Sequence, residues 1–346
     1  MMNSQESSLN NISPETQKDN RKISPLDFFE KDKLKVLQEK KRKTERAAFL
    51  YKSIGDERKA DRLLKCGKYR LYEKYADGSM RLTKTYFCEL RMCPQCMWLL
   101  ARKRAVDLFK ILAEPEHKDK RYIFITLTVR NCKADELSET LDKMYKGLRS
   151  WTSSERAFLN YRILGIVQKL EITYNKKANT FHPHFHLLCE VENSYFKDES
   201  KYIEAPDLSK KWAETLGLDY HPSCKIQAVK KHDTKSVLET AKYTAKDSDY
   251  LINADIFKVF ESALKHRRLY EVKGSFKVTM QRLKLDPDSF EDINNKIADV
   301  VNNNPCVLRF ALIWQIGIKR YTVRIEKSSA ELEELAGKAL ITGTME

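Results

Sequence analysis

The sequence predicts an α+β protein: an antiparallel sheet of β-α-β-β-α-β order, preceded by a helical module rich in cysteine. Two observations carry this prediction. Between residues 119 and 252, segments of alternating or β-rich apolar pattern are separated by segments of helical periodicity. Upstream of them, four of the eight cysteines fall between residues 66 and 96. The element order is that of the ferredoxin-like (RRM-like) fold, and we expect helices on one face of the sheet.

Composition and charge limit the classes of function that the chain could have. The chain has 346 residues, enough for one large domain with appendages or for two domains. Its 64 Lys and Arg against 49 Asp and Glu give a net charge of +15, which favours a polyanion partner, nucleic acid first. The chain has no apolar run that could span a bilayer, and its polar N-terminus lacks the apolar core of a signal peptide. We therefore expect a cytoplasmic protein without a membrane partner.

Changes in composition divide the chain into five segments. The run Lys40–Lys43, followed by Arg46, makes one helical segment strongly basic, either as a solvated surface or as a DNA contact. A second helix, at 98–113, carries the basic run Arg102–Arg104. The five segments are a disordered tail (1–24), a basic helical segment (25–64), a cysteine-rich module with a helix (65–118), the sheet domain (119–252) and a mixed region of unknown role (253–346).

Four cysteines form the first candidate metal site. Cys93 and Cys96 stand in a Cys-x-x-Cys turn, Cys88 lies five residues upstream, and Cys66 completes a set of four sulfurs. Tetrahedral Cys₄ coordination is the usual geometry of structural zinc. Without a signal peptide, cysteines favour thiols or metal ligands over disulfides. A redox Cys-x-x-Cys is the alternative, but no thioredoxin-like βαβ pattern surrounds it. We predict a structural Zn²⁺ here.

The sheet domain follows as a regular series of elements. A polar turn at 175–180 joins its second and third strands. Beyond the domain we expect a helix at 257–264, strands within 307–325 and a helix at 328–340. Within it we expect strands at 122–129, 163–174, 181–191 and 224–229, and helices at 135–151, 207–216 and 234–246.

The third strand carries three histidines at alternate positions. His184 and His186 therefore face the same side, and His182 is a rim residue or a solvated strand end. If the second and third strands form a symmetric hairpin about the turn, residues whose numbers sum to 355 are paired. Glu171 then faces His184, and Lys169 faces His186. Two imidazoles and a carboxylate suit Mn²⁺ or Mg²⁺ working on phosphate, as well as Zn²⁺.

The last helix of the domain carries a second group of reactive side chains. On a helix, Glu239, Tyr243 and Lys246 share one face, which suits a phosphate ligand. The alternative is structural: Ser236-x-x-Glu239 is a capping box, Tyr243 packs and Lys246 is solvated. Tyr250 is a rival tyrosine a short distance downstream.

Three motifs in this order resemble a known family. Ile125-Thr-Leu-Thr128, His184-Phe-His186 and Glu239-x₃-Tyr243-x₂-Lys246 are similar to those of HUH endonucleases that initiate rolling-circle replication of small plasmids. The resemblance covers residues 120–252. Glu239 stands where some members have a second tyrosine, so the chain looks like the single-tyrosine-plus-glutamate initiators of Gram-positive plasmids. The cysteine cluster followed by Trp98 is also similar to that subgroup.

The resemblance implies a nicking reaction on single-stranded DNA at a plasmid's double-strand origin. Tyr243 would attack the scissile phosphate and form a 5′-phosphotyrosine link, with Mn²⁺ or Mg²⁺ held by His184, His186 and Glu171. Lys246 would ease ionisation of the phenol, and Glu239 would activate water at termination. The implied setting is the bacterial cytoplasm, and the implied partners are origin DNA, a host helicase, a DNA polymerase and a second copy of the chain.

Other classes of protein share parts of this pattern. A relaxase or a single-tyrosine transposase of the HUH class would use the same metal site, although mobilisation relaxases usually carry the tyrosine near the N-terminus. A zinc-ribbon DNA-binding regulator would need no catalysis, and its histidine strand would be structural. An RRM has the same element order but needs aromatic residues on its two central strands, where this chain has His184 and His186.

Overall fold

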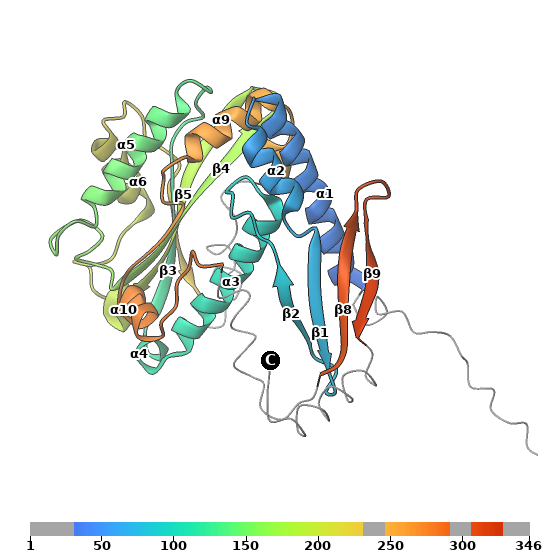
Figure 1. Cartoon of the computed structure of the whole chain (residues 1–346). Coiled ribbons are helices and arrows are strands. Elements are labelled where there is room, and N and C mark those ends of the chain that lie inside the picture. The colour runs from blue at the N-terminus through green and yellow to red at the C-terminus, as the bar shows by residue number, and fades with distance from the viewer. Residues whose placement is uncertain (1–30, 231–245, 291–305, 328–346) are drawn as a thin grey trace, which may run out of the picture.

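The computed structural model describes residues 31–230, 246–290 and 306–327 (Figure 1). Two antiparallel sheets organise these residues, as expected of an α+β protein. The expected tail at 1–24 and the helix at 328–340 lie outside the described residues, and of the helix at 234–246 only Lys246 lies within them. No helix in the described part of the chain is long and apolar enough to cross a membrane.

The first sheet combines strands that are far apart in the sequence. Its four strands are ordered β2-β1-β8-β9, so strands from before and after the larger sheet lie side by side (Figure 1). The β1–β2 hairpin fills the interval between Cys66 and Cys88 and was not predicted from the sequence. Helices precede and follow the hairpin. The elements are α1 (Lys31–Ser53), α2 (Glu57–Lys65), β1 (Tyr69–Tyr75), β2 (Met80–Thr85), α3 (Pro94–Ala113), β8 (Cys306–Gln315) and β9 (Arg320–Lys327).

The second sheet has five strands in the order β6-β3-β5-β4-β7, and every neighbouring pair is antiparallel. Four of these strands were expected, and the edge strand β7 was not. The elements are α4 (Pro115–Lys118), β3 (Arg121–Thr128), α5 (Leu137–Ser150), β4 (Gly165–Asn175), β5 (Thr180–Val191), η2 (Asn193–Phe196), α6 (Ala205–Leu216), β6 (Lys225–Val229), α8 (Asp247–Tyr250), α9 (Ala254–Leu264), β7 (Tyr270–Gly274) and α10 (Ser275–Arg282).

The register of β4 against β5 confirms the predicted hairpin. Glu171 is paired with His184 and Lys169 with His186, and the pairing continues without a bulge to Asn175 and Thr180. Because side chains alternate across a strand, Glu171 and both histidines lie on one face of the sheet.

The two faces of this sheet are covered differently. The helices α5, α6 and α9 lie on the face of Phe185 (Figure 1), where they pack in a continuous apolar layer. Tyr145 of α5 meets the Phe185 ring edge-on at 5.0 Å. On the opposite face, α3 and α10 cover one end through Leu108 and Phe276. The histidines project from this second face, so helices lie on both faces rather than on one as expected.

Two lysines of the basic run of α1 point inward, which neither alternative offered by its charge had predicted, whereas Arg42 and Arg46 of the same run are exposed. Lys41 is fully buried and donates hydrogen bonds to the carbonyl oxygens of Leu64 (2.9 Å) and Cys66 (2.7 Å) at the end of α2. Lys40 is buried against Asp247 at 2.5 Å. These two lysines therefore hold α1 to α2 and α8 and are not available to DNA.

Gly274 joins β7 to α10 in a conformation reserved for glycine. Its φ of 62° and ψ of −141° are strained for any residue with a side chain. An added Cβ would meet the carbonyl oxygen of Leu164 at 2.1 Å. Gly317, by contrast, lies in the β8–β9 turn with nothing within 4 Å of such a Cβ.

We expect Gly274→Ala to lower the free energy of unfolding by about 2–5 kcal/mol, because backbone strain and steric overlap add. Gly317→Ala should change it by less than about 1 kcal/mol. Urea denaturation of the two variants, followed by circular dichroism, measures both values. Equal midpoints for the two variants would contradict the strain at Gly274.

Candidate metal centres and the pocket beside them

Glu171, His184 and His186 converge on one point of the second sheet. The Glu171 Oε2 atom lies 3.2 Å from Nε2 of His186 and 3.9 Å from Nε2 of His184. The three ligand atoms fall within 4.8 Å of one another, and all three residues are half-buried. Ligands about 2.1 Å from one cation at right angles lie roughly 3 Å apart, so the spacing suits a divalent metal.

Hydrogen bonds hold both imidazoles in the orientation that a metal needs. Nδ1 of His184 lies 3.2 Å from the carbonyl oxygen of His182, which can only accept a hydrogen bond, so this nitrogen carries the proton. Nδ1 of His186 lies 3.3 Å from the hydroxyl of Thr126 on β3. The Nε2 atom of each histidine therefore faces Glu171. A histidine that binds a metal usually has this arrangement, with its second ring nitrogen hydrogen-bonded to a neighbouring group.

Charge and burial keep Glu171 and His184 in the form that binds a metal. Lys169 is 1% exposed, and its Nζ lies 2.7 Å from Glu171 Oε2. Burial alone would raise the pKa of Glu171, but the hydrogen bond to His186 and the charge of Lys169 outweigh it and hold this pKa well below the ordinary value. Burial, together with the neighbouring His186, lowers the pKa of His184 to about 4. At neutral pH the carboxylate is therefore ionised and His184 is neutral.

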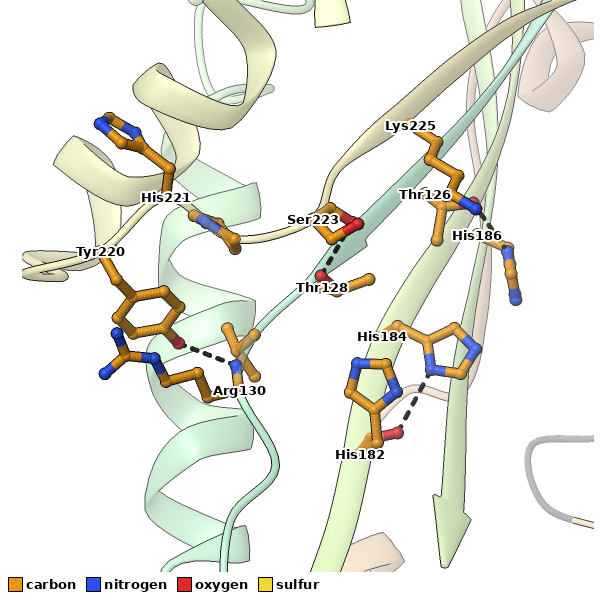
Figure 2. Close-up of a pocket in the computed structure, with 12 residues that line it drawn as sticks. Thr126, Thr128, Arg130, His182, His184, His186, Tyr220, His221, Ser223 and Lys225 are labelled. Atoms are coloured by element: carbon orange, nitrogen blue, oxygen red, sulfur yellow. Dashed lines mark hydrogen bonds between the residues drawn. The ribbon is translucent and has the colours of Figure 1, made fainter. Parts of the chain in front are cut away.

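A pocket of about 580 Å³ opens next to the histidines (Figure 2). Thr126 and Thr128 of β3 lie along it, as do the segment after β3 and the loop that leads into β6. Tyr220 and Arg130 stand on the side away from the histidines (Figure 2). The lining residues are Thr126, Thr128, Val129, Arg130, His182, His184, His186, Tyr220, His221, Pro222, Ser223 and Lys225.

The residues predicted on the last helix of the domain are only partly within the described chain. Glu239 and Tyr243 lie outside it. Lys246 lies within it, but its backbone is extended (φ −70°, ψ 139°) at the start of α8, so a helix that includes Lys246 is wrong. The rival Tyr250 is 4% exposed and its hydroxyl donates to Asp247 at 3.1 Å, inside the core.

The four predicted cysteines lie together between α2 and the start of α3. The Cys66–Cys96, Cys88–Cys96 and Cys66–Cys93 sulfurs are 3.5, 3.7 and 3.7 Å apart, and all four residues are fully buried or nearly so. A disulfide would bring two sulfurs to about 2.05 Å. A tetrahedron with about 2.3 Å from zinc to each sulfur has edges of roughly 3.8 Å, close to these spacings.

Two buried cations lie beside the cysteine cluster, and neither was predicted from the sequence to be near it. Lys41 donates to the carbonyl oxygen of Cys66. Arg70, 1% exposed, donates to the side chain of Gln95, which in turn donates to the same carbonyl at 3.2 Å. Four thiolates around one divalent cation carry a net charge of −2, which nearby cations offset. Only the approach of Lys41 and Arg70 in space, and no spacing in the sequence, identifies them.

Comparisons with known proteins show which family the chain belongs to. A family model described as "Replication protein" matches residues 79–322. The "Protein rep" of Lentilactobacillus hilgardii is 30% identical over 287 residues, covering 79% of this chain and 90% of that protein. The corresponding protein of Lactiplantibacillus plantarum is 32% identical over 277 residues (75% and 85%), and that of Staphylococcus aureus is 34% identical over 223 residues (63% and 95%). No solved structure matches the chain. The chain therefore belongs to the replication protein family.

Proposed function

We propose that this chain initiates rolling-circle replication of a plasmid by nicking one DNA strand at the origin, as a metal-dependent HUH endonuclease. The observation that carries the proposal is the convergence of Glu171, His184 and His186 beside an open pocket. A structural zinc site usually closes four ligands around its metal, whereas a catalytic site leaves positions free for substrate. The family assignment favours an initiator over a relaxase or a transposase.

The topology of the second sheet supports the same proposal. The order β6-β3-β5-β4, with α5 between β3 and β4 and α6 between β5 and β6, is that of a ferredoxin-like core. The two histidines stand on β5, one of its two central strands, and Glu171 on the neighbouring β4. The face carries metal ligands where an RRM needs aromatic residues, which favours an HUH core.

Different residues of the chain would have different roles at the scissile phosphate. Glu171, His184 and His186 would hold a divalent cation, Mn²⁺ or Mg²⁺, which would supply Lewis-acid polarisation of the phosphate. Glu171 and the two imidazoles, which their hydrogen bonds hold in place, would hold that cation. Lys169 keeps the carboxylate ionised and adds a positive charge next to the site.

Tyr243 is the proposed nucleophile, and the length of the chain permits it to reach the metal ligands. Asp249 of α8 accepts a hydrogen bond from the backbone N–H of Tyr174, three residues after Glu171 on β4. Tyr243 lies six positions before Asp249 in the sequence, and each extended residue spans at most about 3.6 Å. Lys246 is exposed and remains the proposed cation that eases ionisation of the phenol.

The attack would join the Tyr243 oxygen to the 5′-phosphate and release a 3′-hydroxyl that a host polymerase extends. The phosphotyrosine bond conserves the energy of the phosphodiester, so rejoining needs no ATP. Glu239 would act as the general base for a water that hydrolyses the link at termination. Origin DNA, a host helicase and polymerase, and a second copy of the chain are the proposed partners, in the bacterial cytoplasm.

We also propose that the four cysteines bind one structural Zn²⁺. Their sulfur spacing and complete burial suit a closed tetrahedral site. The site would tie α2 to the start of α3, and the proposed boundary between the cysteine-rich module and the nuclease domain, near residue 119, follows α4.

The nucleophile is tested by the covalent adduct. With labelled single-stranded origin DNA and Mn²⁺, Tyr243→Phe should lower adduct formation by about 10⁴-fold or more, because the phenol oxygen forms the new bond. Tyr250→Phe, which removes a hydroxyl buried in the core, should still form the adduct. Glu239→Ala should nick normally but release the strand slowly. Denaturing gels show all three outcomes, and an adduct formed by Tyr243→Phe would refute the assignment.

Binding of Mn²⁺ tests the Glu171–His184–His186 cluster. Calorimetry should show that Glu171→Gln weakens affinity about 10- to 100-fold, and Thr126→Val by roughly 10-fold through loss of the bond to His186. His221→Ala, which removes an exposed imidazole outside the cluster, is the matched control and should keep the affinity of the unaltered protein. Retention of full affinity by Glu171→Gln would place the metal elsewhere.

Metal analysis tests the cysteine cluster. We expect one zinc per chain by mass spectrometry, and its loss in Cys96→Ser together with a lower melting temperature, since metal binding contributes to folding. Cys306→Ser removes a half-buried thiol outside the cluster and should retain the zinc. Zinc retained by Cys96→Ser, or a metal-free native protein, would contradict the proposal.

A further inference from the structure

The pocket beside the histidines has an aromatic and cationic wall that neither the metal ligands nor the proposed nucleophile uses. Arg130 follows β3, and its guanidinium carbon lies 3.7 Å from the centre of the Tyr220 ring. The Tyr220 hydroxyl accepts a hydrogen bond of 2.8 Å from the backbone N–H of Arg130. The two side chains therefore form a fixed stack at the edge of the pocket (Figure 2).

The loop that carries Tyr220 is held in place by its own contacts. Thr128 donates from its hydroxyl to the carbonyl oxygen of Ser223 at 3.0 Å, and Ser209 of α6 donates to that of Pro222 at 2.6 Å. These bonds tie the loop to β3 on one side and to α6 on the other. A surface held in this way loses little conformational entropy when a ligand binds.

The charge of the stack is directed to solvent. The Arg130 side chain is 66% exposed, and its nearest carboxylate, Asp219, lies 3.8 Å away and is 89% exposed. An ion pair so exposed contributes little, so stability does not account for the arrangement. Lys225, at the start of β6, extends past Thr126 toward His186 (Figure 2). Among the described residues that line the pocket, none is acidic.

We propose that this pocket binds the nucleotide next to the scissile phosphate, with its base on the Arg130–Tyr220 stack and its phosphate on Lys225. The inference rests on the proposed function, to which it adds a binding subsite for single-stranded DNA. Aromatic rings and guanidinium planes both stack on bases, and cations beside them contact the backbone. The volume, about 580 Å³, is within the range of ligand pockets.

The geometry selects a single strand over a duplex. In a duplex both faces of each base are covered by neighbouring bases, so a base can lie on the Arg130–Tyr220 stack only after it is unstacked. His184, His186 and the stack line the same pocket, so a strand bound there passes the two histidines in an unpaired form. Arg130 and Tyr220 are positioning residues in this reading, since neither touches the reacting atoms.

Binding of two probes tests the proposal: fluorescent oligo(dT) of twenty nucleotides and an abasic strand of the same length, measured by anisotropy with the full-length protein. The unaltered chain should bind oligo(dT) more tightly than the abasic strand. Tyr220→Leu and Arg130→Lys should each reduce that preference by about 5- to 100-fold, because one removes the ring and the other keeps the charge but loses the plane. Tyr220→Phe, which keeps the ring, should retain the preference.

Lys143→Ala is the matched control for charge. It removes one positive charge from an exposed position on α5, which covers the opposite face of the sheet, and should leave the preference for bases unchanged. Melting temperatures of all variants identify any that unfold. A preference for bases that persists in both Tyr220→Leu and Arg130→Lys would overturn the proposal, as would an equal loss on the abasic strand.

Cleavage separates this inference from the proposed function. If the unaltered protein nicks origin DNA and Tyr220→Leu raises KM with kcat little changed, the inference is supported. If nicking occurs but KM is the same in Tyr220→Leu and Arg130→Lys, the subsite is refuted and the endonuclease stands. If no nicking occurs with any divalent metal, the endonuclease proposal is refuted. The proposed role of the pocket in nicking is then refuted too, whatever binding the anisotropy measures.

Discussion

The pairing of β4 with β5 in one register is the constraint on which the candidate centre depends. It holds a carboxylate of one strand against an imidazole of the next without any contribution from a loop. A slip of one residue would carry Glu171 to the apolar face under α5 and expose Leu170 in its place. Buried aromatic residues oppose that slip, because Phe181 and Phe185 fill the layer between the sheet and the helices. The chemistry of one face is thus set by the packing of the other.

The two candidate metal centres differ as a structural and a catalytic site are expected to differ. The sulfurs of the cysteine cluster are surrounded by protein, and buried Lys41 and Arg70 lie around them. The histidine and glutamate atoms are half-buried, border a pocket and have one buried lysine as their nearest cation. The first arrangement suits a metal that never exchanges ligands. The second leaves room for a phosphate.

The sequence predicted the structure correctly where the pattern that determines it lies within one short segment. Alternation and a six-residue turn were enough to pair Glu171 with His184, because a symmetric hairpin leaves one register. The β1–β2 hairpin was missed because Tyr69–Tyr75 mixes charged and aromatic residues without clear alternation. The inward direction of Lys40 and Lys41 could not be predicted either, since their partners lie on other elements and become neighbours only in the fold.

The first sheet has a consequence for how the protein is made. Its inner strand β1 is synthesised early, but its partner β8 begins at Cys306, more than two hundred residues later. Until that strand leaves the ribosome, β1 has a hydrogen-bonded neighbour only in β2, and its other edge is open to any extended chain. Domains tend to fold in order during synthesis, yet this sheet can close only after β8 and β9 have been made. A chain that stops before β8 would therefore leave one edge of β1 unpaired and exposed to association with other extended chains.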